Sequence, residues 1–226
     1  MKENYLQSYL LEGADFTERW EFPILQPCHA IPEALIAFSK TKEKENLNQF
    51  VHFFEEDDKI LPFGRNPRNY FPRLSQFGGV IGCDFSVCRD MPFSEQIGQT
   101  LRNRALTFWL QYRNISVIPN VRFSDARSYE FCFEGIPKNS VISIGTHGCT
   151  KKKEDIHYLI KGILETIKRL KPEAILLYGA VKKEVEFIIT SENVPYKIFP
   201  SDTSEFFKNR EEKSYPLFAG LNVGGA

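Results

Sequence analysis

The sequence predicts an α/β protein built on a mainly parallel sheet with crossover helices. Two amphipathic helical segments alternate with short runs of residues that are apolar at every position. Strands buried on both faces have this pattern, and they belong to parallel sheets covered by helices. Counting every candidate run gives up to eight strands, which suits a (β/α)8-type barrel or a degenerate barrel. An open doubly wound sheet is the alternative.

The two helical segments are expected at residues 91–113 and 154–170. In the first, apolar side chains recur every three or four positions, at Phe93, Ile97, Leu101, Ala105, Phe108 and Tyr112. Asp90 is its expected N-cap, and Pro92 suits its first turn. The second has a similar apolar stripe, and Pro172 ends it.

Four apolar runs next to these helices are predicted to be interior strands: 79–83, 115–119, 141–144 and 174–178. Weaker candidates are strands at 23–25, 34–38, 51–54 and 196–199, and short helices at 128–133 and 182–189. No boundary interrupts this series, so we expect one α/β domain over residues 1–207. A weakly structured C-terminal tail, 208–226, is expected to follow it.

Charge and composition exclude several classes of protein. Lys plus Arg is 29 and Asp plus Glu is 29, so the formal net charge is zero, unlike that of a protein that coats nucleic acid. Hydrophobic residues make up 42%, which argues against a disordered chain. A basic and aromatic run, with Arg65, Arg68, Arg73, Tyr70 and Phe71, suits single-stranded nucleic acid. An amphipathic helix with snorkelling arginines is the favoured interpretation of this run.

The cysteines and the hydropathy pattern bear on the cellular compartment. The five cysteines (Cys28, Cys83, Cys88, Cys132 and Cys149) are odd in number and include no C-x-x-C pair. No run approaches 18 apolar residues, and residues 1–5 contain no apolar signal core. We therefore expect a cytoplasmic protein with reduced thiols and no membrane segment.

Polar residues follow the predicted strands at one end of the sheet, where parallel α/β folds bind ligands. Asp84 follows one strand, and Asn120, Arg122 and Asp125 follow the next. The turn after 141–144 contains Gly145, Thr146, His147, Gly148, Thr150 and Lys151. The opposite strand ends have mainly turn residues, and this asymmetry is the main functional signal in the sequence.

The turn at 145–153 is the best single candidate for an anion site. A glycine-containing turn before a helix presents backbone N–H groups to an anion, and the helix dipole adds positive potential. The predicted ligand-binding residues are Asn120, Arg122, Gly145, Thr146, Gly148, Thr150 and Lys151. The predicted acid–base residues are Asp84, Asp125 and His147. The alternatives are a plain turn, a structural histidine and a charge network that closes the sheet end.

Other kinds of site have little support in the sequence. The acidic run at 55–58 fits a solvated loop better than a cation site, so no metal site is predicted, and no cofactor is identified. The motifs of P-loop NTPases, dinucleotide-binding folds, zincins and α/β-hydrolases are absent from the sequence.

Five segments in chain order carry a family resemblance. They are FGGVIGCDFS (77–86), RDMP (89–92), IPNVR (118–122), YEFCFEGIPKN (129–139) and IGTHGC (144–149). They resemble an uncharacterised family of phages and mobile elements of Gram-positive bacteria, domain of unknown function 4417. The resemblance spans roughly residues 16–196. It implies a mobile-element setting and supplies no reaction.

Three functional hypotheses follow. The first is a phage-type accessory protein that binds or processes a phosphorylated small molecule or nucleotide at the carboxyl ends of the strands. The second is a non-enzymatic module that binds a host or element-encoded protein. The third is nucleic-acid processing, which the zero net charge does not favour. Whether the protein is an enzyme stays open at this point.

Overall fold

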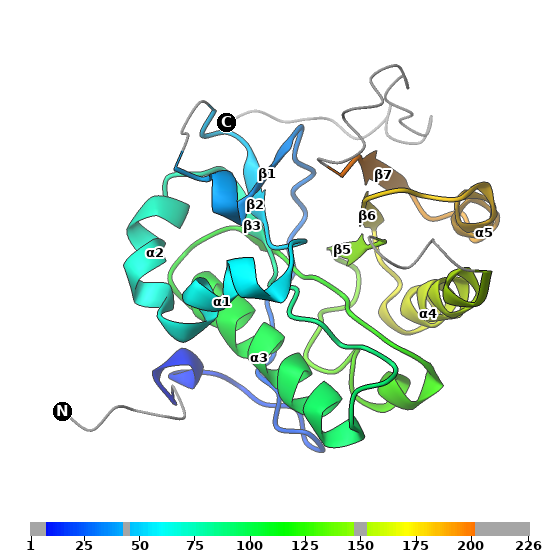
Figure 1. Cartoon of the computed structure of the whole chain (residues 1–226), viewed down its shortest axis with the longest axis horizontal. Coiled ribbons are helices and arrows are strands. Elements are labelled where there is room, and N and C mark those ends of the chain that lie inside the picture. The colour runs from blue at the N-terminus through cyan, green and yellow to red at the C-terminus, as the bar shows by residue number, and fades with distance from the viewer. Residues whose placement is uncertain (1–7, 43–45, 147–152, 202–226) are drawn as a thin grey trace.

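The computed structural model describes residues 8–42, 46–146 and 153–201. Its strands form two sheets (Figure 1). The first sheet contains β1 (Leu35–Ala37), β2 (Phe50–His52), β3 (Gly79–Ile81) and β4 (Val117–Ile118) in that order. The second contains β5 (Val141–Gly145), β6 (Ala174–Tyr178) and β7 (Tyr196–Phe199). Each ladder between these strands is parallel, which confirms a mainly parallel α/β fold.

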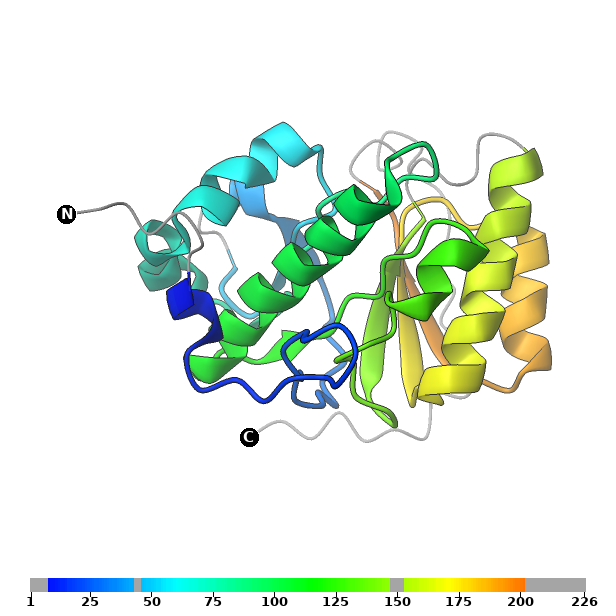
Figure 2. The same cartoon turned by 90° about the horizontal axis from the view of Figure 1, so that it is seen from below.

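Helices connect the strands and cover the sheets. They are α1 (Asp57–Arg65), α2 (Pro67–Leu74), α3 (Phe93–Tyr112), α4 (Lys153–Leu170) and α5 (Lys183–Ser191). Three short 3-10 helices are η1 (Ser8–Leu11), η2 (Phe38–Lys40) and η3 (Ala126–Glu130). In both views α1, α2 and α3 lie beside the first sheet, and α4 and α5 pack side by side against the second (Figures 1 and 2).

Both long predicted helices are present, but the predicted N-cap of α3 was wrong. The cap residue is Pro92, two positions after Asp90. Its backbone is extended, and its carbonyl accepts the first helical hydrogen bonds, from the N–H groups of Glu95 and Gln96. The Gln96 side chain donates to the Met91 carbonyl, and no side chain among the described residues accepts from the first N–H groups of the helix as Asp90 was expected to do.

Most strand positions are apolar because most strand residues are buried, with His52, Ser143 and Lys197 as polar exceptions. In β3, Val80 packs into the core beneath α1–α3, and Ile81 packs into a cluster on the opposite face. In β6, Leu177 packs beneath α4 and α5, whereas Leu176 joins the same opposite-face cluster as Ile81. This shared cluster contains residues of both sheets. The strand pattern therefore reports two buried faces, as predicted.

The two sheets are joined through the segment that follows β4. Asn120 forms a parallel bridge with Ser143 of β5, and the Ser143 N–H donates to the Pro119 carbonyl. The strand order in each sheet follows the chain without the reversal that defines a doubly wound sheet. Within the described residues there are seven strands and no ladder between β7 and β1, so these ladders do not establish a closed barrel.

Some weaker predictions were wrong. The segment 23–25 forms no strand: Pro23 has no N–H to donate and makes only an isolated antiparallel bridge with Phe16. The N–H groups of the next two residues donate to carbonyls of other loops, at Asp15 and Gly135. The acidic run 55–58 is only partly a loop, because its last two residues begin α1. The predicted tail, 208–226, lies outside the described residues.

Two observations bear on the expected compartment, one on the cysteines and one on membrane-spanning helices. Cys28, Cys83, Cys88 and Cys132 are free thiols, and Cys149 lies outside the described residues. None of the helices in the described part of the chain is both long enough and apolar enough to cross a membrane.

Candidate functional site

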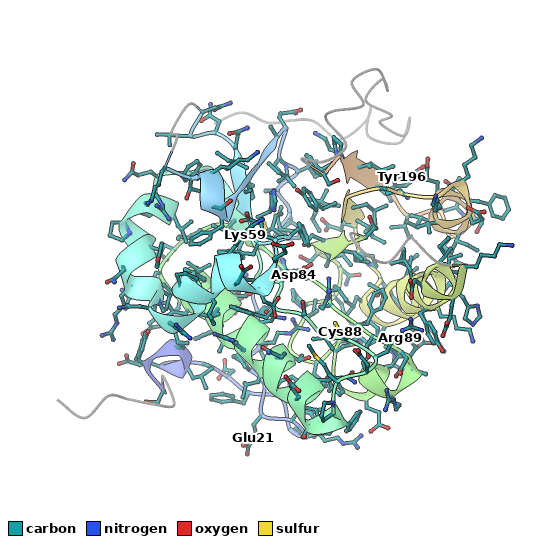
Figure 3. All side chains as sticks on the ribbon, viewed as in Figure 1. Glu21, Lys59, Asp84, Cys88, Arg89 and Tyr196 are labelled. Atoms are coloured by element: carbon teal, nitrogen blue, oxygen red, sulfur yellow. The ribbon has the colours of Figure 1, made fainter. Side chains whose placement is uncertain are left out.

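The candidate site centres on Asp84, which follows β3. Its carboxylate accepts a hydrogen bond from Asn120 Nδ2 at 2.7 Å and pairs with Arg122 Nη1 at 3.2 Å. All three residues lie beyond the carboxyl ends of adjacent parallel strands, β3 and β4. Asp84 lies near the middle of the molecule, between α1 and β5 (Figure 3). These three side chains therefore meet beyond the carboxyl ends of β3 and β4.

Buried polar groups hold the residues of this network in position through further hydrogen bonds. Asn120 is held through its backbone carbonyl by Arg104 Nη1 at 3.3 Å and through its side chain by the Ser143 hydroxyl at 3.3 Å. The amide of Asn103 donates to the Phe85 carbonyl and accepts from the Phe85 N–H, at 2.9 and 2.8 Å. This pair of bonds fixes the turn immediately after Asp84.

Gly145, at the end of β5, borders the same network. A Cβ atom at this position would lie 2.8 Å from the Phe54 ring and 3.6 Å from Asp84 Oδ2. A side chain at 145 would therefore displace the ring or crowd the carboxylate. Close packing alone thus explains why this position is a glycine. Its neighbour Thr146 is fully buried, and its hydroxyl lies 3.1 Å from the Tyr178 carbonyl and 2.9 Å from the Ala180 carbonyl. That hydroxyl bonds to the backbone after β6.

Asp125 lies in a different hydrogen-bond network from Asp84. It caps η3, accepting from the Arg127 N–H, and pairs with the Arg127 guanidinium at 2.8 Å. These hydrogen bonds hold the pKa of Asp125 below its usual range. Arg127 also donates to the Arg89 carbonyl, so Asp125 organises a loop contact. The remaining predicted residues (His147, Gly148, Thr150 and Lys151) lie outside the described part of the chain.

Burial dominates the electrostatics of Asp84. Desolvation raises its pKa above the usual carboxyl range, and the nearby Asp57 carboxylate acts in the same direction. Arg122 and Asn120 act oppositely but do not outweigh burial. A carboxyl group with a raised pKa is suited to proton transfer, and such groups gather at functional sites.

Sequence reasoning missed several residues around this network. Asp57, in the first turn of α1, accepts from the Ser86 N–H at 3.1 Å and from the Ser86 hydroxyl at 2.9 Å. His52 is buried in β2, with its ring 4.3 Å from that of Tyr178. A polar residue within an apolar strand was the available signal for His52. For Asp57 the signal was hidden, because the acidic run resembled a solvated loop.

The loop after β3 also reaches α4. Arg89 pairs with Glu154 at 3.0 Å and Asp155 at 2.6 Å, and its guanidinium lies 4.1 Å from the centre of the Tyr158 ring. Asp84, Cys88 and Arg89 follow one another along this loop, and Arg89 is the nearest of them to α4 (Figure 3). The loop that carries Asp84 is therefore tied to the first turns of the helix that follows β5.

Two further features concern other kinds of site. The described residues contain no group of three or more His, Cys, Asp or Glu side chains arranged to hold a metal ion. A shallow, mainly apolar hollow lies on the outer surface of α4 and α5. It is lined by Ile160, Lys183, Glu184, Phe187 and Ile188, and the Phe187 residue is 70% exposed.

Comparison with known proteins places the chain in a family. The "Gene 1 protein" of Mycobacterium phage D29 and that of Mycobacterium phage L5 are each 28% identical to it over 166 residues, or 72% of the chain. The matched region spans 62% of the D29 protein and 72% of the L5 protein. No solved structure matches. The family profile described as "Domain of unknown function (DUF4417)" matches residues 14–194, so the chain belongs to this phage-associated family.

Proposed function

We propose that this phage-associated protein binds or processes a phosphorylated small molecule or nucleotide at the carboxyl ends of its strands. The observation that carries the proposal is the buried Asp84 carboxylate clamped by Asn120 and Arg122. An ion pair at this position is costly to bury and needs a compensating role. Parallel α/β folds place their ligands at this end of the sheet.

Each member of the network has a distinct part in this proposal. The Arg122 side chain is 20% exposed, so its guanidinium touches both the buried carboxylate and the surface. A guanidinium binds phosphate through paired N–H groups. Asp84 accepts or gives the proton, a role suited to a carboxyl group whose pKa is raised by burial. The sequence places His147, Gly148, Thr150 and Lys151 after β5, and the proposal gives them the anion-binding and acid–base roles predicted above.

The proposal includes a degenerate barrel as the scaffold. Support comes from the bridge between Asn120 and Ser143, which links the two sheets at one boundary. At the other boundary, Lys197 of β7 donates to the Pro32 carbonyl at 2.9 Å, just before β1. The apolar cluster shared by both sheets would then be the barrel interior. In such a barrel Asp84 and Arg122 stand at the rim that holds ligands in this fold.

A ligand screen followed by matched variants tests the site. ATP, GTP, glucose 6-phosphate and inorganic phosphate serve as probes in thermal-shift assays, and we expect at least one to raise the melting temperature. Calorimetry with that probe then compares Arg122→Ala with the wild type. Loss of a charge-assisted phosphate contact should weaken binding by about tenfold to a hundredfold.

Arg19→Ala is the matched control, because Arg19 pairs with Glu130 at 3.0 Å on an exposed part of the surface. It should bind the probe as the wild type does. Unchanged affinity in Arg122→Ala would remove Arg122 from the site. Failure of all four probes to stabilise the protein at millimolar concentration would end the proposal.

A second function, binding of a host or element-encoded protein, is favoured by the exposed hollow on α4 and α5. An aromatic side chain as exposed as Phe187, beside Ile160 and Ile188, suits an interface anchor. A photo-crosslinking amino acid at position 187 should capture one defined protein in phage-infected cells. The same group at Tyr112, which is also exposed but lies on α3, should not capture it.

A further inference from the structure

The arginines of this protein fall into two groups by their partners. Arg68, Arg73, Arg102 and Arg113, which we call the arginine face, have no carboxylate within ion-pair distance among the described residues. Five others each pair with a carboxylate: Arg19, Arg89, Arg122, Arg127 and Arg169. The arginine face belongs to α2, to α3 and to the residue that caps the end of α3.

The sequence explains this division. The stretches 59–83 and 96–124 contain no Asp or Glu, and all four members of the arginine face lie within them. The zero net charge of the chain is therefore an average over an uneven distribution. Neutrality of the whole protein does not exclude a local basic surface.

Like charges gather on this surface. Tyr9 of η1 lies close enough to both Arg68 and Arg113 for the two cations to lower its pKa against the raising effect of burial. Burial lowers the pKa of Arg102; Cys83 and the Asp57 carboxylate act in the opposite direction, and the nearby Arg65 cation adds a smaller lowering effect. Clustering of cations is unfavourable in the isolated protein and becomes favourable when an anion lies between them.

Aromatic rings hold the guanidinium groups in fixed orientations. The guanidinium carbon of Arg68 lies 4.0 Å from the centre of the Tyr9 ring, and that of Arg102 lies 3.9 Å from the centre of Phe85. Arg113 is placed over Trp109 at 4.7 Å. A stacked guanidinium keeps its N–H edges for hydrogen bonding, and little conformational freedom is left to lose when an anion binds.

Two buried donors on α2 and α3 have no hydrogen-bond partner among the described residues. They are Arg73 Nε, on α2, and Trp109 Nε1, on the side of α3 that packs near η1. Buried polar atoms are normally paired, so each such atom calls for an explanation. Arg73 is itself a member of the arginine face, and Trp109 lies under the Arg113 guanidinium, so both donors belong to residues of this surface.

We propose that the arginine face binds the phosphate backbone of a nucleic acid. Arg102 lies on α3 and Arg113, eleven positions later, caps the end of that helix, so the helical repeat places them on one side and ~16 Å apart. That span matches the rise of about five nucleotides in one strand. The aromatic rings are already covered by guanidinium groups, so the contacts are to phosphate and are independent of base sequence. Arg102 contacts Phe85, next to Asp84, but no member of the arginine face bonds to the Asp84 carboxylate, and the proposal goes beyond the function proposed for that site.

Salt-dependent binding tests the proposal. Fluorescence anisotropy measures the affinity of the wild type for a labelled 20-nucleotide single strand and a 20-base-pair duplex over a range of salt concentrations. Each phosphate contact contributes about 0.7 (single strand) or 0.9 (duplex) to the slope of log affinity against log salt. The Arg68→Gln/Arg113→Gln double variant should reduce the magnitude of the slope by about 1.4 or 1.8.

Three controls make the result decisive. Arg19→Gln/Arg169→Gln removes the same charge elsewhere and should keep the wild-type slope. If the double variant does not fold, each single substitution should reduce the slope by half as much. Equal slopes in the two double variants would overturn the proposal. Competition by poly-glutamate as strong as that by DNA of equal charge would also overturn it, in favour of an acidic protein partner.

Discussion

Asp84 and Arg104 are buried charges that the protein stabilises in different ways. Asp84 has an amide and a cation as partners, whereas Arg104 donates to three backbone carbonyls, of Asn120, Cys132 and Glu134. Burial lowers the pKa of Arg104 to about 10, which still leaves it charged at neutral pH. The cation therefore supports the site by fixing the backbone of Asn120.

The raised pKa of Asp84 predicts how stability depends on pH. The folded protein keeps the Asp84 proton over a pH range in which the unfolded chain has lost it. Stability from this group is therefore intact in acid and decreases as the pH rises toward the folded-state pKa. The side chain in Asp84→Asn does not titrate, so the pH-dependent decrease in stability should disappear. Arg122 loses its partner in this variant, but it is partly exposed and can turn to solvent. Urea unfolding at pH 4.5 and at pH 8 should show the variant gaining stability relative to the wild type as the pH rises. A pH-independent difference would contradict this.

Arg104→Met should destabilise the protein strongly. The substitution keeps an unbranched side chain but leaves three buried carbonyls without donors, at a cost of about 3–5 kcal/mol in the free energy of unfolding. Arg104→Lys keeps the charge and should lose less, because an ammonium group cannot reach all three carbonyls. Arg19→Ala, on the exposed surface, should change stability by less than about 1 kcal/mol. Equal effects at positions 104 and 19 would refute this role for Arg104.

The sequence predicted part of the site, for physical reasons that particular residues illustrate. Asp84, Asn120 and Arg122 follow neighbouring parallel strands, and parallel strands end at one edge, so their meeting was predictable. Asp125 lies three residues beyond Arg122, but it is the N-cap of η3 and pairs with Arg127 instead of joining the Asp84 network. Arg104 was not predictable, because nothing in a helical stripe distinguishes a buried cation from an exposed one.

At the scale of elements, replacing each of two helical glycines by alanine should change stability in opposite directions. In α4, a Cβ on Gly162 would clash with the Phe123 ring, next to Arg122, whereas a Cβ on Gly98 in α3 would have nothing within 4 Å. Gly98→Ala should stabilise the protein by up to about 1 kcal/mol through helix propensity alone. Gly162→Ala should destabilise it by about 1–3 kcal/mol, because the ring must move. Chemical denaturation measures both, and a gain in stability at 162 would show that the ring yields freely.

The Arg89 contacts predict a coupling between the loop after β3 and α4. Arg89→Ala removes both ion pairs and the stacking on Tyr158. Amide hydrogen exchange in residues 83–92 and in the first turns of α4 should become about threefold to tenfold faster. Lys168→Ala, which removes an exposed pair with Glu165 at the other end of α4, should leave both segments unchanged. Exchange that changes in neither segment would exclude the coupling.

Elements were predictable where one physical signal dominated. The seven strands and both long helices carry buried faces, so hydrophobic pattern alone located them. The segment 23–25 is just as apolar, and Leu25 is buried, yet Pro23 cannot donate to a ladder. The N–H groups of Ile24 and Leu25 instead donate to carbonyls of other loops, at Asp15 and Gly135. A local sequence pattern does not encode such long-range hydrogen bonds.

At the scale of the whole molecule, the two sheets have their own helices but share one apolar cluster. Phe50 and Ile81 of the first sheet and Leu176 and Phe199 of the second belong to this cluster. Neither sheet retains this buried face without the other. This sharing is the physical basis for expecting one domain over residues 1–207, and it predicts cooperative unfolding.

The two tryptophans report on the two halves separately. Trp109 is 1% exposed in the core beneath α1–α3, and Trp20 packs against the core beneath α4 and α5. In Trp20→Phe only Trp109 fluoresces, and in Trp109→Phe only Trp20 does. In each variant the fluorescence midpoint in urea should coincide with the far-ultraviolet circular dichroism midpoint of the same variant, because loss of either half exposes the shared cluster. Comparison within one variant cancels the stability cost of the substitution itself. A fluorescence midpoint below the dichroism midpoint in one variant and above it in the other would mean that the halves unfold independently and that the chain contains two domains.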